Sequence, residues 1–577
     1  MIRNQRRRVL GIALLLGVGL LVGAARVVTL STFDNARLAA ASEGQSLRRE
    51  HLPARRGSLR DRHGRLLASS VETLELAAWP PNLKPAHKTS GQNAERIRAI
   101  AQTLAPWVGV PADELRAGMV GERNVVLGSP VSAPDGIELL RAKRLTELRQ
   151  LDFSTGMARR YPWGVAAGNL LGFVNAEQQG VAGLEQGLSM LLSGEDGARR
   201  YRVDQRGREI AEDGLPVLPP MHGLDVVLTL DVALQQMLEQ ELVRVCAEQE
   251  ARRAFAVLLD TRSAEVLALA SVPGLNPDDS SDRPRDSVII GPVQEIYPPG
   301  STFKPLMMAA ALELGIISAD ESVDCRAERG VLPGRRIRDT HPQDRWLSLE
   351  EVIVHSSNIG MANIFMSLVS PDTPRDREAM APVRELLVRL GFGARIGVPL
   401  PAEAPGMITP LERWHRTWTL ASVTYGQEIS VTALQMAAAV NSLSDGIWRR
   451  PSLVKGHWSA LGEYVETPPA DERVVFASRH VELVRGWMAR AVAEGSCREV
   501  KLPGVAVAGK TGTADSEVDL TREIHSYAAL APAEDPEVTL VVVVSEPAHA
   551  RYSSQSAAPA AGRILARVLP YLGHPVQ

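Results

Sequence analysis

The second half of the chain carries short apolar runs whose spacing alternates between the period of a strand and that of a helix. Two strands joined by a turn are predicted over AFAVLLDTRSAEVLALAS. The preceding VALQQMLEQELVRVCAEQEARR has the period of an amphipathic helix. Further elements are predicted in the same way, namely strands over LDVVLTLD, AGKTGTA and VTLVVVVSEP and a closing helix over SAAPAAGRILARVLPYL. The pattern therefore predicts an α/β fold in which helices cover both faces of a sheet.

The first half of the chain shows weaker periodicity and ends in a connection rich in Pro and Gly. Residues 31–50 have the charge pattern of a helical stalk, and residues 55–220 mix short alternating runs with turn signals. GLPVLPPMHG, at residues 214–223, marks a boundary. The predicted organisation is a tail at residues 1–8, a membrane anchor at 9–30, a stalk at 31–54, an elongated pedestal domain at 55–220 and a C-terminal domain at 221–577.

A single long apolar run stands near the N-terminus. Residues 9–25 are 17 residues without a charge, directly after the arginine-rich MIRNQRRR. This length lies at the lower limit for a membrane span and above the usual core of a signal peptide. The arginines predict a cytoplasmic N-terminus, one span and an external body formed by the rest of the chain. The small residues of GAA at the end of the run leave a cleaved signal peptide open as the alternative.

Composition and charge narrow the functional classes. The net charge is only −3, without the basic stripe or stacked aromatic pattern of nucleic-acid binders, so no nucleic-acid partner is expected. Cys246, Cys325 and Cys497 are far apart in the sequence and form no CxxC motif. A Cys325–Cys497 disulfide and free buried thiols both remain open. The His, Asp and Glu residues show no spacing typical of metal ligands, so we expect neither a metal nor a cofactor.

Three short polar clusters follow one another in the predicted C-terminal domain, which is referred to below as the catalytic region. They are PPGSTFKP with Ser301 and Lys304, HSSNIG with Ser356 and Asn358, and AGKTGTA with Lys510, Thr511, Gly512 and Thr513. Each cluster alone is weak evidence, because SxxK and SxN arise by chance in a chain of this length. All three in this order indicate a serine that forms an acyl-enzyme.

The first cluster supplies a nucleophile and a base. A serine hydroxyl is a poor nucleophile at neutral pH and needs an adjacent base. The run STFKPLMMAAALELG predicts a helix that starts near Ser301 and continues to Gly315, with Lys304 on the same face as the serine. Lys304 can accept a proton only if its pKa is lowered, and burial beside a second cation, Lys510, would lower it.

The other two clusters complete the expected site. Ser356 is expected to relay a proton between the two lysines, and Asn358 to orient Lys304 and a substrate carbonyl. AGKTGTA is predicted to be an edge strand on which an extended peptide lies by β-augmentation. We expect Gly512 to keep that strand free of a side chain where the substrate comes close.

The order SxxK, SxN and KTG resembles that of the penicillin-binding proteins and serine β-lactamases. The upstream segments ARRGSLRDRHGRLLA, RRYPWGVAAGNLLGFV and GVAGLEQGLSMLLSG resemble the non-catalytic motifs of class B penicillin-binding proteins. WHRTWTLASVTYGQEISVTALQMAAAVNSL and HSYAALAPAEDPEVTLVVVVSEP resemble the division-type branch of that class. The chain is thus similar to a division-type class B penicillin-binding protein, which implies the serine transpeptidase fold of that family beside the pedestal and the anchor.

The resemblance implies a peptidoglycan D,D-transpeptidase of the bacterial inner membrane, with its catalytic domain in the periplasm. The implied roles are nucleophile for Ser301, base for Lys304, proton shuttle for Ser356, substrate orientation for Asn358, binding of the carboxylate end for Lys510, Thr511, Gly512 and Thr513, and an oxyanion hole from the backbone N–H groups of Ser301 and Thr513. The implied partners are stem peptides ending in D-Ala-D-Ala, β-lactams, a SEDS-type glycosyltransferase and other division proteins.

Alternatives and departures from the family pattern remain. The alternatives are an elongation-type class B enzyme, a β-lactamase or D,D-carboxypeptidase of the same superfamily, and a scaffold or receptor without turnover. The departures are His63 for a usual Asn, Arg285-Asp286 for a usual Arg-Asn pair, and Tyr552-Ser553-Ser554 for the Tyr-Gly-Gly of many division-type members. None of these departures is expected to touch the acylation residues.

Overall fold

The structure is a computed structural model that describes most of the chain. The described residues are 2–32, 47–84, 89–120, 125–145, 148, 151–204, 209–210, 215–279, 284–332, 335–369, 376–415, 417–495, 497–515 and 522–576. The chain divides into two compact units, one of Met1–Ala54 with Gly194–His222 and one of Arg55–Ser193 with Gly223–Gln577.

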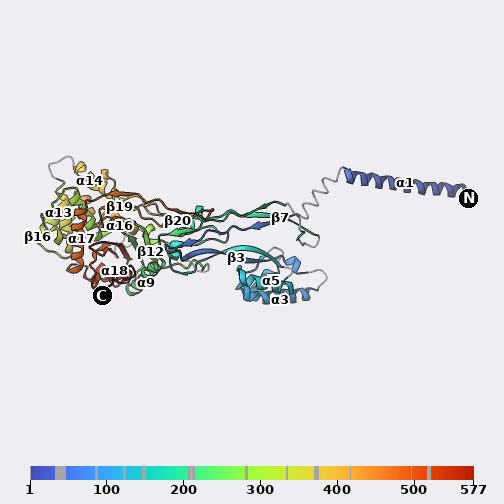
Figure 1. Cartoon of the computed structure of the whole chain (residues 1–577), viewed down its shortest axis with the longest axis horizontal. Helices are drawn as coiled ribbons and strands as arrows, with labels where there is room; N and C mark the ends of the chain where they lie inside the picture. Colours follow the sequence, from blue (N-terminus) through green and yellow to red (C-terminus); the bar gives the residue numbers. More distant parts are fainter. Residues whose placement is uncertain are drawn as a thin grey trace. The chain divides into compact units, whose positions relative to one another are not determined.

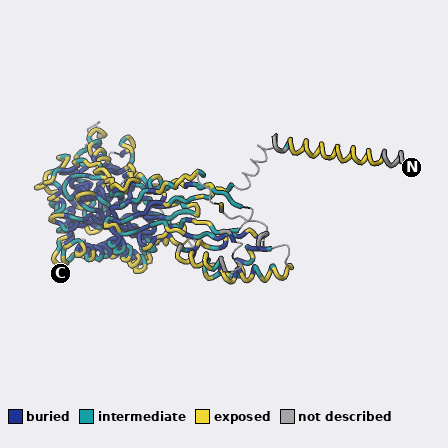
Figure 2. Tube along the Cα trace, turned by 45° about the vertical axis from the view of Figure 1, so that its right-hand side comes forward, coloured by how far each residue is buried: buried dark blue, intermediate teal, exposed yellow. Residues whose placement is uncertain are grey.

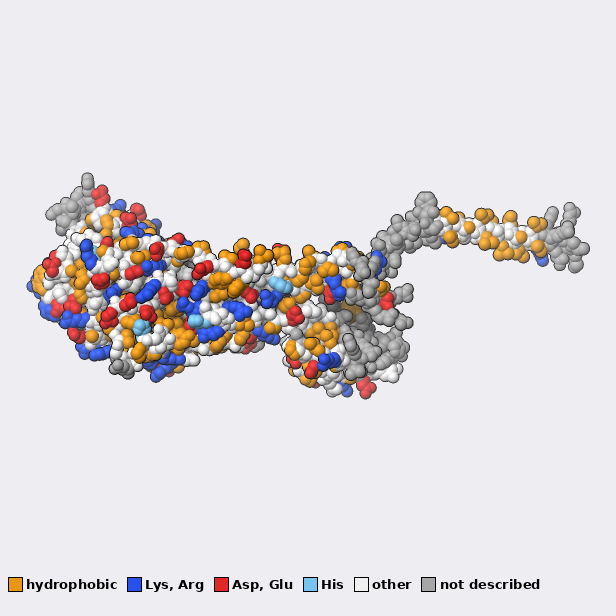
Figure 3. Space-filling model, in the orientation of Figure 1, with side chains coloured by type: hydrophobic (Ala, Val, Ile, Leu, Met, Phe, Trp, Pro, Cys, Tyr) orange, Lys and Arg blue, Asp and Glu red, His pale blue; other side chains and the backbone are white. Residues whose placement is uncertain are grey.

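The first unit contains the predicted apolar run within one continuous helix. This helix, α1 (Ile2–Thr32), begins before the predicted anchor at residues 9–30 and ends after it. Its stretch Arg8–Thr29 spans 22 residues with a mean hydropathy of 2.2, and its side chains are exposed (Figure 3). Among the described residues it is the one helix long and apolar enough to cross a membrane, which is consistent with a single-pass anchor.

The prediction of a helical stalk over residues 31–50 is wrong at its C-terminal end, although α1 extends to Thr32. Residues 47–50 belong to a strand, β1 (Leu47–Leu52), which pairs antiparallel with β7 (Gly197–Val203). Two further strands pair with β7, namely β8 (Glu209–Ile210) and β9 (Val217–Leu218). Across the first pair Arg199 Nε donates to the Glu50 carboxylate at 2.7 Å. Pairing with a distant strand thus overrides the helical preference of a charged run. Most of the stalk lies outside the described residues.

The second unit contains a five-stranded antiparallel sheet in the catalytic region. Its strand order is β12 (Val266–Val272), β11 (Arg253–Asp260), β25 (Val538–Ser545), β24 (Glu523–Ala531) and β23 (Ala508–Asp515). The strands predicted over AFAVLLDTRSAEVLALAS and VTLVVVVSEP are confirmed. The strand β23, which carries AGKTGTA, lies at the sheet edge as predicted.

Helices cover both faces of this sheet, as predicted. Alternate residues of a strand point to opposite faces. One face packs against α9 (Val232–Gln249) and α18 (Ala557–Tyr571), and the other belongs to a core that includes α11 (Lys304–Glu313) and α16 (Ala433–Asn441) (Figures 1 and 2). Because both faces are buried, β11, β12 and β25 are apolar at nearly every position and not at alternate ones.

A second sheet combines strands from the segment upstream of the catalytic region with strands from that region. Its order is β21 (Tyr464–Glu466), β20 (Val454–Trp458), β10 (Val226–Leu228), β2 (Leu59–Arg60), β3 (Leu66–Ala78) and β4 (Val125–Val126), with β5 (Val131–Ser132) and β6 (Leu151–Arg160) also paired to β3. A separate apolar cluster lies against β3, formed with α3 (Ser90–Val108), α4 (Ala112–Gly118) and α5 (Ala133–Leu145).

The same unit contains further helices and strands. The helices are α6 (Gly168–Leu171), α7 (Gly183–Gly187), α8 (Ser189–Leu192), α10 (Gly291–Gln294), α12 (Leu349–Val354), α13 (Asn358–Met366), α14 (Asp376–Arg389), α15 (Trp418–Thr424) and α17 (Ser478–Ala493). The strands are β13 (Ser322–Asp324), β14 (Val331–Leu332), β15 (Arg335–Arg336), β16 (Trp346–Ser348), β17 (Met407–Ile408), β18 (Ile429–Ser430), β19 (Ile447–Arg449) and β22 (Glu472–Val474). The three cysteines are free thiols.

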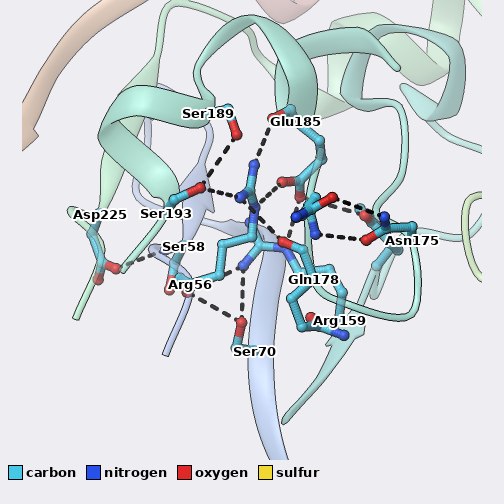
Figure 4. Close-up of polar contacts among 12 residues, drawn as sticks. Arg56, Ser58, Ser70, Arg159, Asn175, Gln178, Glu185, Ser189, Ser193 and Asp225 are labelled. Carbon is cyan, nitrogen blue, oxygen red and sulfur yellow. Dashed lines mark hydrogen bonds and ion pairs between the residues drawn. The ribbon is translucent and has the colours of Figure 1, made fainter. Parts of the chain in front are cut away.

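One buried carboxylate joins the three upstream motif segments (Figure 4). Glu185 accepts a hydrogen bond from Arg56 Nε at 2.6 Å and another from Arg159 Nε at 2.7 Å. Arg56 also donates to the Ser193 hydroxyl at 2.9 Å. The two guanidinium groups and the carboxylate are almost fully shielded from solvent. Such a cluster is stable only while each charge keeps its partner.

We expect Glu185→Ala to destabilise the protein by about 3–5 kcal/mol, because it leaves two buried guanidinium groups without a counter-charge. The free energy of unfolding, measured by denaturant titration of the detergent-solubilised chain, tests this expectation. The exposed Glu177 offers a matched control, and Glu177→Ala should change the stability by less than about 0.5 kcal/mol. Equal losses in the two variants would contradict the role given to the buried cluster.

Candidate active site

The three polar clusters meet at one open cavity of about 660 Å³. Five of the predicted site residues line it, namely Ser301, Ser356, Asn358, Thr511 and Thr513. Lys304 and Lys510 are both fully buried. The structure therefore brings together clusters that are separated by many residues in the sequence. Gly512 does not line the cavity.

Ser301 lies in a tight turn that leads directly into α11. The turn is a 3₁₀ helix, Gly300–Phe303, and α11 follows at Lys304, so the predicted helix start is confirmed with a tighter first turn. Side chains three residues apart eclipse in a 3₁₀ helix, which places Lys304 on the side of Ser301. Gly300 has a φ of +54°, and a Cβ there would lie 2.8 Å from the Thr513 carbonyl oxygen. The turn that carries Ser301 thus packs closely against β23.

Lys304 is held by the corner of the second cluster. Its Nζ donates to the Ser356 carbonyl oxygen at 2.5 Å and to the Ser356 hydroxyl at 3.1 Å. Burial lowers the pKa of Lys304 well below its usual value, the nearby charge of Lys510 lowers it further, and the charge of Asp339 raises it. The predicted direction of this pKa shift is confirmed. A neutral amine beside a serine hydroxyl can accept a proton.

Lys510 is the second buried lysine of the site. It lies on β23, and its Nζ donates to the Thr511 carbonyl oxygen at 3.2 Å. Burial also lowers the pKa of Lys510. The side chains of Thr511 and Thr513 reach the cavity from the same edge strand. An edge strand with hydroxyl groups in a cleft can bind an extended peptide through main-chain hydrogen bonds.

The expectation for Asn358 is only partly met. The residue lines the cavity, but its Nδ2 donates to the Arg338 carbonyl oxygen at 2.9 Å. Among the described residues, Lys304 Nζ donates its hydrogen bonds to Ser356 and not to Asn358. Asn358 opens α13, and this position turns its amide toward the Arg338 segment.

The reason given for Gly512 is wrong. A Cβ at this position would lie 2.7 Å from the Pro299 carbonyl oxygen and 2.6 Å from the Ser526 hydroxyl. The close neighbour is therefore the chain itself, at the turn that carries Ser301. The glycine allows the nucleophile turn and the edge strand to approach each other, which brings Ser301 and Thr513 to the same cavity.

Two features of the site were not predicted from the sequence. The Ser553 N–H donates to the Thr513 hydroxyl at 3.3 Å, so the Tyr552-Ser553-Ser554 departure does touch β23 at a predicted site residue. Asp339 is buried and accepts a hydrogen bond from the Ser357 hydroxyl at 2.6 Å. No motif marks Asp339, because its partner lies 18 residues further along the chain.

Comparison with known proteins places this geometry in a family. Residues 254–566, more than half of the chain, match the family described as the penicillin binding protein transpeptidase domain. Residues 51–228 match the penicillin-binding protein dimerisation domain. The chain belongs to the class B penicillin-binding proteins. It is a penicillin-binding D,D-transpeptidase of peptidoglycan and a β-lactam target, and the predicted family, fold and type of enzyme are confirmed.

Several relatives resemble this penicillin-binding protein over most of its length. Peptidoglycan D,D-transpeptidase FtsI of Escherichia coli K12 is 29% identical over 566 residues, which cover 96% of this chain and 90% of that protein. Stage V sporulation protein D of Bacillus subtilis is 27% identical and covers 90% of this chain and 78% of its own length. The crystal structure of penicillin binding protein 3 from Mycobacterium tuberculosis with aztreonam superposes with a TM-score of 0.66 at 23% identity, covering 92% of this chain and 98% of that one.

Replacing Lys510 with Met should shift the pH–rate profile of acylation. Its acid limb, the range in which the rate rises as Lys304 loses its proton, should move to higher pH. The substitution removes a neighbouring positive charge, so the pKa of Lys304 rises and a higher pH is needed to deprotonate it. The rate of adduct formation with a fluorescent penicillin, measured across pH, tests this expectation. The exposed Lys501 provides the control, since Lys501→Met should leave the limb in place. An acid limb that does not move in Lys510→Met would contradict the coupling between the two lysines.

Proposed function

We propose that this penicillin-binding protein cross-links stem peptides through an acyl-enzyme on Ser301, and that it does so in the septal wall during cell division. The observation that carries the first part is the burial of Lys304 next to the turn of Ser301, with a lowered pKa and a hydrogen bond to Ser356. A buried neutral amine beside an accessible serine is the arrangement that an activated nucleophile requires.

Each of the three polar clusters contributes to the proposed acylation step. The Lys304 amine removes the Ser301 proton while Oγ attacks the carbonyl between the two D-Ala residues. The backbone N–H groups of Ser301 and Thr513 stabilise the oxyanion. The C–N bond then breaks, and the departing D-Ala amine receives its proton from Lys304 by way of the Ser356 hydroxyl. The terminal carboxylate binds to the hydroxyl groups of Thr511 and Thr513, near the Lys510 charge.

Transfer reverses these steps with a second substrate. The amine of a neighbouring stem peptide attacks the carbonyl of the Ser301 ester and gives up a proton to Lys304. The bond between the acyl carbon and Ser301 Oγ then breaks, Lys304 returns the proton to Oγ, and the cross-linked amide leaves. Asn358 lines the cavity where the donor peptide's carbonyl would bind. A β-lactam follows the first half of this path, but its ring nitrogen stays attached after ring opening and blocks the second half. The aztreonam complex of the Mycobacterium tuberculosis relative supports this part of the proposal.

The division role rests on sequence similarity and on the arrangement of the chain. The Escherichia coli relative and the division-type segments of the sequence favour it, whereas the Bacillus subtilis relative favours sporulation. We place a cytoplasmic tail at residues 1–8, an anchor at 9–30, a stalk at 31–54 and a pedestal at 55–220. The transpeptidase domain at 221–577 lies on the periplasmic side of the inner membrane in this proposal. The anchor and pedestal are the surfaces proposed to meet a SEDS-type glycosyltransferase and other division proteins.

Ser301→Ala should abolish covalent penicillin labelling while the fold is retained, because the change is small and lies at the cavity surface. Lys304→Ala should slow acylation by about 10²–10⁴-fold, the usual contribution of a general base. Intact-mass analysis of the detergent-solubilised chain over several hours measures both effects. An adduct that forms on Ser301→Ala would show that another residue is the nucleophile, and a rapid loss of the wild-type adduct would favour a hydrolase.

Depletion of the protein in its bacterium should give long filaments without septa, because septal cross-linking would stop while elongation continues. Microscopy of the depleted cells, complemented with either wild type or Ser301→Ala, measures the effect. Round cells would favour an elongation role, and normal division with defective spores would favour sporulation. Full rescue by Ser301→Ala would favour a scaffold without catalysis.

A further inference from the structure

We propose that Asp339 is a positioning residue of this site, which fixes the corner formed by Ser356, Ser357 and Asn358 and thereby holds Lys304 in place. The inference rests on the proposed function, because it assigns Asp339 an effect on acylation through Lys304. Asp339 lies in the short segment after β15, outside the three polar clusters.

The Asp339 carboxylate binds three groups at the start of α13. Its Oδ2 accepts a hydrogen bond from the Ser357 hydroxyl at 2.6 Å. Its Oδ1 accepts from the backbone N–H of Asn358 at 2.5 Å and from that of Ile359 at 3.0 Å. The first N–H groups of a helix have no partner within the helix, and a carboxylate there also meets the positive end of the helix dipole. A buried charge thus receives full compensation from one helix start.

The Ser357 hydroxyl connects the carboxylate with the helix cap. It donates to Asp339 and at the same time accepts from the Gly360 N–H at 2.9 Å, as the N-cap of α13. The neighbouring Arg338 carbonyl accepts from the Asn358 amide at 2.9 Å. Two consecutive residues therefore bind the corner from one side, through the carboxylate of one and the carbonyl of the other.

The corner needs this support because Ser356 has an unfavourable backbone conformation. Its φ is +58°, in the left-handed region that residues with a Cβ seldom adopt. This conformation directs both the carbonyl oxygen and the hydroxyl of Ser356 at Lys304 Nζ, at 2.5 and 3.1 Å. Without the Asp339 contacts, the corner could relax to a common conformation and withdraw both acceptors from the lysine.

Asp339 also acts on Lys304 through its charge. Lys304 faces Lys510 from β23, which lowers its pKa, and Asp339 from the segment after β15, which raises it. Burial gives the largest effect on this pKa. Asp339 also lies near Cys325 at the end of β13, where burial raises the thiol pKa to about 11 and the carboxylate adds to that shift. Removal of the Asp339 charge therefore lowers the pKa of Lys304 further.

Two variants separate the contacts from the charge. Asp339→Ala removes both, and we expect acylation at the optimal pH to slow by about 10²-fold, as for a misplaced catalytic group. Asp339→Asn keeps an acceptor for the helix N–H groups but loses the charge. We expect it to acylate faster than Asp339→Ala, and to move the acid limb of the rate toward lower pH. Rates of fluorescent penicillin labelling of the full chain, measured from pH 5 to pH 10, give both quantities.

Asp324→Asn is the matched control. The Asp324 backbone carbonyl accepts a hydrogen bond from Asn363 of α13, but its carboxylate binds Arg326 at 2.7 and 2.9 Å. It should keep the wild-type rate and acid limb. An Asp339→Asn protein with the wild-type limb would overturn the inference, as would an Asp339→Ala protein within about twofold of the wild-type rate. If Asp339→Ala does not fold, the position of the acid limb in the pH–rate profile of Asp339→Asn still tests the inference. If the wild type forms no adduct on Ser301, the proposed function fails instead.

Discussion

The burial of the Lys304 side chain beside Lys510 is the constraint on which the rest of the active site depends. An isolated ammonium group in a protein interior is so costly that the group gives up its proton instead. The core supplies this burial, because α11 is enclosed along almost its whole length by the helices and the sheet around it. The chemistry of the cavity is therefore a consequence of the packing of the domain. Within the part of the chain that the structure describes, the Lys304 amine finds its hydrogen-bond acceptors at the Ser356 corner.

The same unit also contains buried cations that keep their charge. Around Glu185 two guanidinium groups keep their charge, because each is directly paired with the carboxylate. Arginine cannot lose its proton in a protein, so pairing is the only way to bury it there. Lysine can lose its proton, so the burial of two lysines close together favours a neutral amine that can act as a base. The first arrangement stabilises the connection between the upstream motif segments, and the second produces reactivity.

The sequence predicted the parts of this structure that local pattern determines. The apolar runs of β11, β12 and β25 identified the sheet, and the spacing of Ser301 and Lys304 identified the nucleophile turn. Contacts between distant segments could not be predicted. The close approach of Pro299 explains Gly512, the Ser553 N–H meets Thr513, and Asp339 reaches the start of α13, yet none of these pairs has a local signature. The helix predicted for the charged run before residue 50 was wrong for the same reason. That run pairs with a strand that begins at Gly197, far along the chain.

The most direct test is the pH dependence of wild-type acylation by a fluorescent penicillin, measured on the full chain with intact-mass confirmation of the Ser301 adduct. The account predicts an acid limb that lies well below pH 10.5, the ordinary pKa of a lysine, because burial and Lys510 both lower the pKa of Lys304. An acid limb close to pH 10.5 would mean that Lys304 keeps its proton in the folded protein. In that case the base must be another group, and the central claim would be contradicted.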